Sequence, residues 1–217
     1  MSAGIEVWGR ASSINVQKVM WAIGELGLSC TRQHRGGPFG GLDTPDFGAM
    51  NPNKLIPVLQ DGNVRIWESN AIVRYLSQRY GQGTLYPATS AALANADQWM
   101  DWSITTLYGD LIPGVFIKMI RVPAAERDHD AVAAAAQRTG ARMQMLDELI
   151  GARAHLTGDA LTMGDIAVGT LLYRYFNLEM ERPATPNVER WYAALCERPA
   201  YKEHVMHDFS AMKVPGA

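Results

Sequence analysis

The sequence predicts two domains: an α/β domain with the element order β-α-β-β-β-α, followed by an all-α domain. Three observations lead to this fold class. Residues 1–81 alternate short β-like apolar runs with runs of helical spacing. Residues 82–88 form a linker rich in Gly, Pro and Thr. Residues 89–217 carry helical periodicity and no convincing strand, and a chain of 217 residues can hold two small domains.

The first strand is predicted over residues 5–8, with a turn at Gly9. A helix follows up to Gly27, because apolar residues recur there at helical spacing: Val16, Val19, Met20, Ile23 and Leu26. Residues 30–33 favour a second short strand. Residues 34–47 contain four Gly and two Pro and therefore indicate a loop.

Residues 55–68 predict a β-hairpin, because two apolar runs flank an Asp61-Gly62 turn. Residues 69–80 predict the helix that closes this domain. Its apolar residues have helical spacing: Ile72, Val73, Leu76 and Tyr80.

The second domain is predicted to contain several helices. The apolar positions of the first helix are Leu93, Ala96, Met100, Ile104, Leu107 and Leu111. Pro113 should break this helix. A second helix is marked by Val132, Ala136, Thr139, Met143, Leu146 and Ile150. The stretch "LTMGDIAVGTLLYRYF" opens with Thr162-x-x-Asp165, a variant of the capping box, and is too densely apolar for a surface helix. We therefore expect this helix to form the core of the second domain. Two shorter helices are predicted after Pro186 and Pro199.

Composition and charge exclude several classes of function. The formal net charge of −2 gives no reason to expect a nucleic acid or an anionic membrane as partner. The N-terminus "MSAGIEVWGR" lacks the apolar region of a signal peptide, and no apolar run approaches the roughly 20 residues of a transmembrane helix. Cys30 and Cys196 form no metal-binding or redox spacing. We therefore expect a soluble, cytoplasmic protein without disulfides.

Two short motifs have both a structural and a functional interpretation. Ile56-Pro57 lies in a strand-like run, where Pro removes a ladder donor. In the structural interpretation, Pro57 lies in an edge strand. In the functional interpretation, the Ile56-Pro57 peptide bond is cis, which turns the chain and leaves the backbone of Ile56 open to an extended peptide. Ser69 stands at a helix start, where it is either a plain N-cap or part of a carboxylate site that uses free N–H groups and the helix dipole.

Five segments carry a resemblance to a known family. The opening "SSINVQKVMWAIGELGL", and "NPNKLIPVL" followed by "DGNVRIWESNAIVRYL", resemble the glutathione-site half of a cytosolic glutathione transferase. "GGPFGGLDTPDF" and "QWMDWSITTL" resemble bacterial members related to the theta and nu groups. The resemblance covers nearly the whole chain. It implies a thioredoxin-like N-terminal domain, an all-helical C-terminal domain and usually a homodimer.

The resemblance implies roles for the residues of a glutathione site. A cis Ile56-Pro57 bond would expose the backbone of Ile56 to the tripeptide. Ser69 would bind the γ-glutamyl carboxylate, and Glu68 would face the ammonium. Further residues are expected around the ligand. Lys54, His34 and Arg35 could reach the glycyl carboxylate, and Asp97 would act across a dimer interface. Many relatives carry the basic residue one place later, where this chain has Leu55.

A hydrogen-bond donor must also face the sulfur of glutathione. By alignment with the family, we favour Ser13, then Asn15, then Ser12. The Tyr used by many animal relatives and the Cys typical of a mixed-disulfide mechanism are absent from this segment. The second, hydrophobic substrate is expected against one helix, at Trp102, Thr106, Leu107, Tyr108 and Leu111. Any one of these residues can equally be an ordinary core or dimer contact.

Other candidate sites are weaker. The His204-x-x-His207 pair has helical metal-ligand spacing but lacks further ligands, so we expect a surface pair and no metal site. Nucleotide-binding glycine motifs are absent. Asp165 is better interpreted as a cap than as a catalyst.

Three functions remain open at this level. The first is a glutathione transferase that uses glutathione as co-substrate and attacks a small hydrophobic electrophile. The second is a glutathione-dependent disulfide reductase or peroxidase. The third is a non-catalytic regulatory module with the same fold, which the presence of Ile56, Pro57, Glu68 and Ser69 makes less favoured.

Overall fold

The computed structural model describes residues 4–216, which form two compact units. The first comprises the chain up to Ala88 together with Pro199–His207, and the second comprises Thr89–Arg198 together with the chain from Asp208 onward. Within the described residues, no helix is both long enough and apolar enough to span a bilayer.

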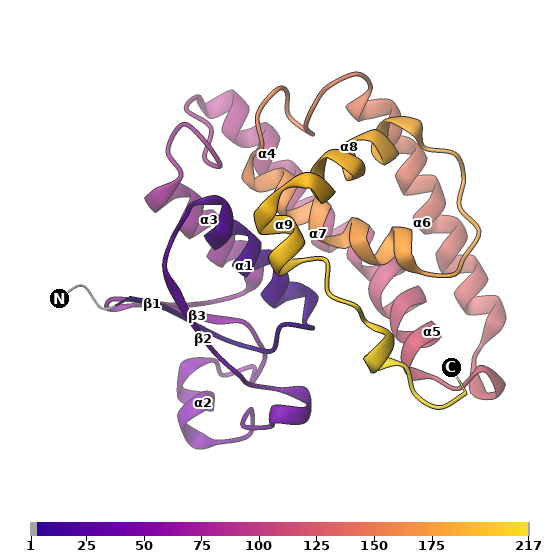
Figure 1. The fold of residues 1–217 in the computed structure, drawn as a ribbon, viewed down its shortest axis with the longest axis horizontal. Helices are drawn as coiled ribbons and strands as arrows, with labels where there is room; N and C mark the ends of the chain where they lie inside the picture. The colour runs from indigo at the N-terminus through magenta and orange to yellow at the C-terminus, as the bar shows by residue number, and fades with distance from the viewer. Residues whose placement is uncertain (1–3, 217) are drawn as a thin grey trace. The chain divides into compact units, whose positions relative to one another are not determined.

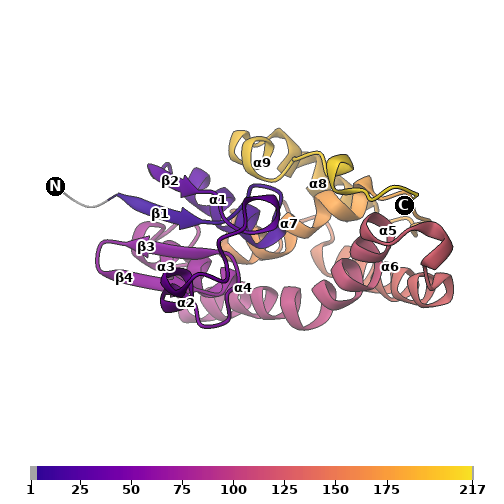
Figure 2. The same cartoon turned by 90° about the horizontal axis from the view of Figure 1, so that it is seen from below.

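The first unit is built on a four-stranded mixed sheet with the strand order β2-β1-β3-β4 (Figures 1 and 2). The strands are β1 (Ile5–Trp8), β2 (Cys30–Gln33), β3 (Val58–Asp61) and β4 (Val64–Trp67). β1 pairs parallel with β2 and antiparallel with β3, and β3 and β4 form the hairpin. The predicted strands and the thioredoxin-like order of elements are therefore confirmed.

Two amphipathic helices of the first unit pack against each other: α1 (Ile14–Glu25) and α3 (Ser69–Tyr80). Most of their apolar positions are fully buried, among them Val16 and Val19 of α1 and Leu76 of α3, whereas Tyr80 at the end of α3 is exposed. Full burial of such a side chain contributes about 1.5–3 kcal/mol. The same packing brings the first turns of both helices together, and this arrangement positions the candidate site.

One prediction for the first unit is wrong. Residues 34–47 are not all loop, because the short helix α2 (Pro45–Met50) begins inside this segment. Thr44 is its N-cap and accepts a hydrogen bond from the N–H of Phe47 at 3.3 Å, and Pro45 opens its first turn. Thr followed by Pro is a helix-start signal that the many nearby glycines obscured.

The C-terminal helix α9 (Pro199–His204) belongs to the first unit, although the sequence suggested the helical domain. It packs on α1, where the rings of Trp21 and Tyr201 meet edge to face at 4.7 Å. A Cβ at Gly24 would lie 2.9 Å from the Cβ of Ala200, so the absence of a side chain there permits the contact. Such a long-range contact leaves no local signal.

The second unit is helical. Its α-helices are α4 (Ser90–Trp102), α5 (Ile117–Arg121), α6 (His129–Ile150), α7 (Met163–Asn177) and α8 (Pro186–Glu197). The break predicted at Pro113 is wrong: the chain continues from α4 to α5 through two π-helical segments, Ser103–Leu107 and Asp110–Phe116, and Pro113 lies inside the second. A wider π turn accommodates a residue without an N–H, so the proline is absorbed without ending the helix.

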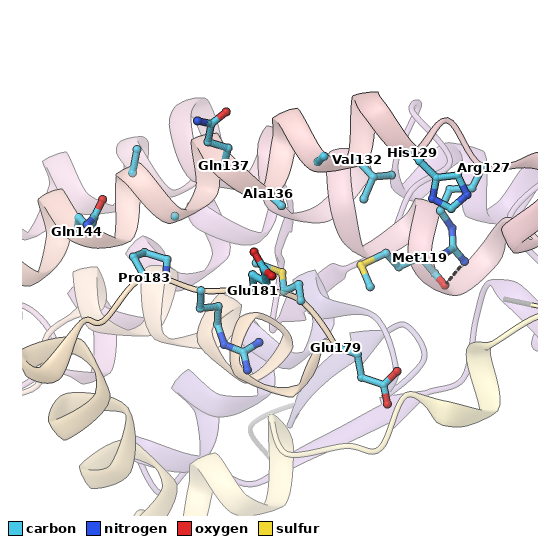
Figure 3. A pocket seen from close by; sticks show the side chains of 15 residues that line it. Met119, Arg127, His129, Val132, Ala136, Gln137, Gln144, Glu179, Glu181 and Pro183 are labelled. Atoms are coloured by element: carbon cyan, nitrogen blue, oxygen red, sulfur yellow. Dashed lines mark hydrogen bonds between the residues drawn. The ribbon is translucent and has the colours of Figure 1, made fainter.

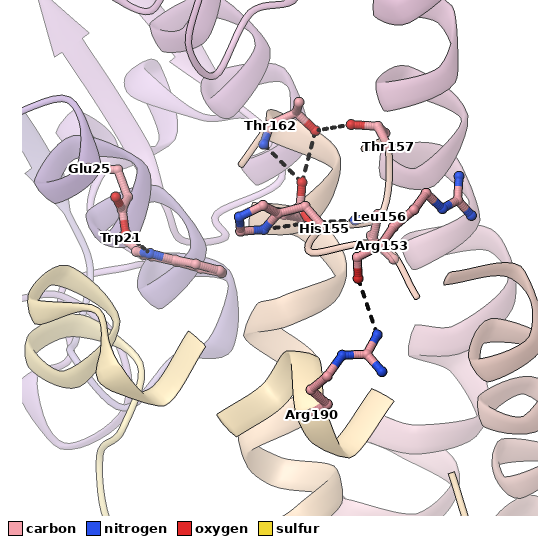
Figure 4. Close-up of polar contacts among 9 residues, drawn as sticks. Trp21, Glu25, Arg153, His155, Leu156, Thr157, Thr162 and Arg190 are labelled. Carbon is pink, nitrogen blue, oxygen red and sulfur yellow. Dashed lines mark hydrogen bonds and ion pairs between the residues drawn. The ribbon is translucent and has the colours of Figure 1, made fainter. Parts of the chain in front are cut away.

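The core helix α7 begins with the predicted capping box (Figure 4). The carboxylate of Asp165, which is fully buried, accepts hydrogen bonds from the N–H and the hydroxyl of Thr162 at 2.9 and 3.0 Å. Its other oxygen accepts from the N–H of Leu156 at 2.9 Å. Asp165 therefore joins the start of α7 to the preceding loop, which confirms its interpretation as a cap.

Gly164 lies where α7 packs closely against α4, and we expect Gly164→Ala to destabilise the protein by about 1–3 kcal/mol. An added Cβ would lie 2.8 Å from the carbonyl oxygen of Ala96, which is backbone and cannot rotate away. Gly109→Ala is the matched control, because it adds the same methyl in a helical conformation with open space around it. That variant should gain about 0.5–1 kcal/mol. Urea unfolding measures both, and a Gly164→Ala protein as stable as the parent would contradict the packing.

Candidate functional site

The first candidate group is the start of α1. Ser13 is its N-cap residue by backbone conformation (φ −80°, ψ 123°), yet its side chain makes no capping hydrogen bond. Within the described residues the Ser13 hydroxyl makes no other hydrogen bond, and the side chain is half-buried. A serine at this position usually accepts from the first turn of its helix. Here the hydroxyl stays available as a donor beside the positive end of the helix dipole.

The second group is a polar cluster that joins the first turns of α1 and α3. The hydroxyl of Ser69 donates to Asn15 Oδ1 at 3.3 Å and accepts from Lys18 Nζ at 3.2 Å. Lys18 also donates to Asn70 Oδ1 at 2.7 Å. Ser69 is 5% exposed and lies in the first turn of α3, where free backbone N–H groups attract an anion.

Lys18 and Asn70 were not predicted as site residues. A signal for Lys18 existed, because it stands four residues after Ile14 and four before Ala22, both buried positions of one helix face. A lysine on such a face must find buried partners. Which partners it finds depends on α3, fifty residues later in the chain, so the cluster itself could not be derived from local pattern.

The third group is the loop before β3. The Ile56-Pro57 bond is cis, as the family resemblance implied. Within the described residues, the backbone N–H and C=O of Ile56 have no hydrogen-bond partner. The buried side chain of Asn51 fixes this loop: its Nδ2 donates to the carbonyl of Leu55 at 2.8 Å, and its Oδ1 accepts from the N–H of Asn53 at 3.0 Å. Asn51 is a supporting residue that the motif alone did not reveal.

Two non-glycine residues near these groups have positive φ angles, Lys54 (53°) and Glu68 (72°). This conformation disfavours L side chains by about 1–3 kcal/mol and is often found at functional sites. The carbonyl of Glu68 accepts from the N–H of Ile72 at 2.9 Å, so Glu68 is held at the start of α3 with its side chain exposed. The ammonium of Lys54 lies 3.6 Å from Asp43 Oδ1, and both side chains are largely exposed.

The other predicted residues lie in different places. His34 is exposed, with its ring 4.6 Å from that of Phe39, and its carbonyl accepts from Arg35 Nη1 at 2.9 Å. Asp97 is a half-buried residue of α4 in the second unit. The residues expected around a hydrophobic substrate also belong to the second unit. Leu107 and Leu111 are fully buried there, whereas the half-buried ones are Trp102, Thr106 and Tyr108.

Thiol chemistry by the protein itself is not favoured in the first unit. Cys30 and Cys196 are free cysteines. Burial is the main cause that raises the pKa of the Cys30 thiol to about 11, so this thiol stays protonated at neutral pH. A thiolate formed near Ser13 would therefore have to come from a bound ligand.

One cavity of the second unit is unrelated to these groups. A cavity of about 750 Å³ lies between α6 and the segment Glu179–Pro183, with Arg127 and His129 at one end (Figure 3). None of the predicted site residues lines it. In the part of the chain described, no three His, Cys, Asp or Glu side chains come together as a metal site would require.

Comparison with known proteins identifies the family. Residues 3–78 match the model described as Glutathione S-transferase, N-terminal domain, and residues 111–199 match Glutathione S-transferase, C-terminal domain. The Escherichia coli K12 protein named Glutathione S-transferase GstB is 40% identical over 204 residues, which are 93% of this chain and 98% of that protein.

Solved structures agree with the sequence comparison. A theta class glutathione S-transferase from Xanthomonas axonopodis pv. citri, solved with glutathione bound, is 43% identical and superposes with a TM-score of 0.90, over 96% of this chain and 99% of that one. Its apo form is 38% identical and gives a TM-score of 0.82 over 94% and 98% of the two chains. The two family models together span more than half of this sequence, one in each half. The chain belongs to the glutathione S-transferase family.

Proposed function

We propose that this chain is a glutathione transferase that binds glutathione in its first unit and holds the sulfur as a thiolate for attack on a small hydrophobic electrophile. The observation that carries the proposal is the hydrogen bond of 3.3 Å between Ser69 and Asn15. It joins the N-termini of α1 and α3, so a donor for sulfur and a site for a carboxylate belong to one cluster. Family membership supports the same activity.

The proposed binding mode uses each group in turn. The open backbone of Ile56 pairs with the cysteinyl residue of the tripeptide, as an added strand would. Ser69 and the N-terminus of α3 bind the γ-glutamyl carboxylate, and Glu68 faces the ammonium of the same residue. Lys54, together with His34 or Arg35, would bind the glycyl carboxylate.

Activation of the thiol requires only modest stabilisation. Lowering a thiol pKa by about 2 units requires about 2.7 kcal/mol of preferential stabilisation of the thiolate. A hydrogen bond to a charged group contributes about 1.5–3 kcal/mol, and a helix dipole contributes up to about 2 kcal/mol. The hydroxyl of Ser13, which makes no capping bond at the start of α1, can act as this donor beside the helix dipole, whereas the side chain of Asn15 is oriented toward Ser69 by the hydrogen bond that its Oδ1 accepts. We therefore assign the sulfur-facing role to Ser13.

The proposed reaction forms a bond between the glutathione sulfur and an electrophilic carbon, and the leaving group departs with the bonding electron pair. The protein contributes position and a lowered pKa, not a covalent nucleophile. The half-buried residues Trp102, Thr106 and Tyr108 are the proposed contacts of the electrophile, whereas Leu107 and Leu111 are fully buried. We further propose a cytoplasmic homodimer with a detoxifying role, in which Asp97 acts across the subunit interface.

Two measurements test this proposal. Calorimetry should detect saturable binding of millimolar glutathione to the folded protein. Steady-state assays should then show faster turnover with an aryl chloride than with a mixed disulfide, because the first unit offers a donor to a thiolate and no reactive cysteine. Binding without turnover of either substrate would favour a regulatory module, and faster disulfide turnover would favour a reductase. Absence of binding would refute the proposal.

A further inference from the structure

Lys18 is a buried cation without an anionic partner. Its side chain is almost fully buried in α1, at 2% exposure. Its Nζ donates to two neutral oxygens, Ser69 Oγ at 3.2 Å and Asn70 Oδ1 at 2.7 Å. Among the described residues, no carboxylate lies within ion-pair distance of it. A buried ammonium normally has a counter-charge, so its absence at this position requires an explanation.

The surroundings of Lys18 leave its charge poorly stabilised. Burial is the main cause that lowers the pKa of Lys18 to about 7. Glu68 at the start of α3 raises this pKa, and Arg74 farther along α3 lowers it. The helix α9, which also packs on α1, carries the charged or titratable residues Lys202, Glu203 and His204. At neutral pH, protonated and neutral Lys18 therefore coexist in comparable amounts.

We propose that Lys18 is a proton-linked positioning residue of the glutathione site: it takes up a proton when a carboxylate docks at the start of α3, and as an ammonium it then orients Ser69. This inference rests on the function proposed above and extends it. The proton comes from solvent and adds to the neutral amine, so no other reactant is needed. Because Ser69 Oγ accepts from Lys18, the hydroxyl proton of Ser69 points away from Nζ. In the free protein that proton is donated to Asn15 Oδ1 at 3.3 Å, and a docked carboxylate would replace Asn15 as its acceptor.

The sign of the pH dependence follows from this linkage. A bound carboxylate stabilises the ammonium and raises the pKa of Lys18 above its value of about 7 in the free protein. The affinity for the carboxylate ligand is therefore highest below pH 7 and has fallen about twofold at pH 7. Above pH 7 it falls, by at most about tenfold per pH unit, until the pKa of the ligand-bound state is passed.

The test measures proton uptake directly. S-methylglutathione is the probe, because it has the same carboxylates as glutathione but no ionisable thiol. Titration calorimetry at pH 7.5 in phosphate and in Tris, whose heats of ionisation differ, gives the number of protons bound with the ligand. We expect uptake of on the order of half a proton by the wild type. Lys18→Met should bind without this uptake, and Lys202→Met, which removes an exposed lysine of α9, should behave as wild type.

Lys18→Arg separates charge from shape. An arginine stays protonated, so this variant should bind with no uptake and with an affinity that stays flat between pH 6.5 and about pH 8. Thermal melts of each variant check the fold, and the wild-type measurement in two buffers stands without any variant. Wild-type binding without proton uptake would overturn the inference, as would equal uptake by Lys18→Met. If the wild type bound no ligand at any pH, the proposed function itself would fail.

Discussion

Replacing Ser13 by Ala should lower kcat/KM for conjugation to an aryl chloride by about a hundredfold or more at neutral pH, because removal of one preorganised donor to a developing or stored anion typically has this effect. The affinity for glutathione should stay near that of the parent, since the carboxylate site at Ser69 and the backbone of Ile56 are untouched. Initial rates and titration calorimetry measure the two quantities separately.

The pH profile of the same variant gives an independent check. Loss of a hydrogen bond worth about 1.5–3 kcal/mol raises the pKa of the bound thiol by about 1–2 units. The rate deficit of Ser13→Ala should therefore be largest at low pH and shrink as pH rises through the new pKa. Ser12→Ala is the matched control one residue earlier and should be nearly as active as the parent. A Ser13→Ala enzyme as fast as the parent would transfer the role to Asn15.

The second large effect concerns stability. Asp165→Ala should destabilise the protein by about 3–5 kcal/mol, because the buried carboxylate satisfies the N–H groups of Leu156 and Thr162 and the hydroxyl of Thr162. Without it, those donors stay buried and unpaired at the start of the core helix. Denaturant unfolding followed by tryptophan fluorescence measures the change.

Two controls make the Asp165 result specific. Asp159→Ala removes an exposed carboxylate from the same loop and should change stability by less than about 0.5 kcal/mol. Asp165→Asn keeps the shape but replaces one acceptor oxygen by a donor, so its loss should be intermediate. If Asp165→Ala lost no more than the exposed control, the capping role would be wrong.

Much of the fold was predictable because its signals are local. The strands at residues 5–8 and 30–33, the helix Ser69–Tyr80 and the Thr162–Asp165 cap all lie where the pattern placed them. Each depends on side-chain spacing or on contacts within a few residues. The errors were also local: the glycines of residues 34–47 hid the start of α2, and Pro113 was accommodated by a π turn instead of ending a helix.

The candidate site divides in the same way. Ser13, Ile56, Pro57 and Ser69 were chosen from short motifs and a family resemblance, and their assignment to glutathione remains a prediction. Asn70 and Asn51 emerged only from the structure, and so did the partners of Lys18, because the importance of these residues lies in what they contact. A lysine in a helix is ordinary in sequence, and only the approach of α3 shows that its ammonium is buried against neutral oxygens.

The amino-acid order alone therefore determined the strands and most of the helices, where the two halves of the chain differ and which short motifs could bind a tripeptide. Only the tertiary structure decided that α9 packs on α1, that the hydroxyl of Ser13 is uncommitted and that Lys18 shares Ser69 with Asn15. The physical reason is range. Backbone preference and apolar periodicity act over a few residues, whereas burial, hydrogen-bond partnership and the pKa of a buried group depend on residues brought together from distant parts of the chain.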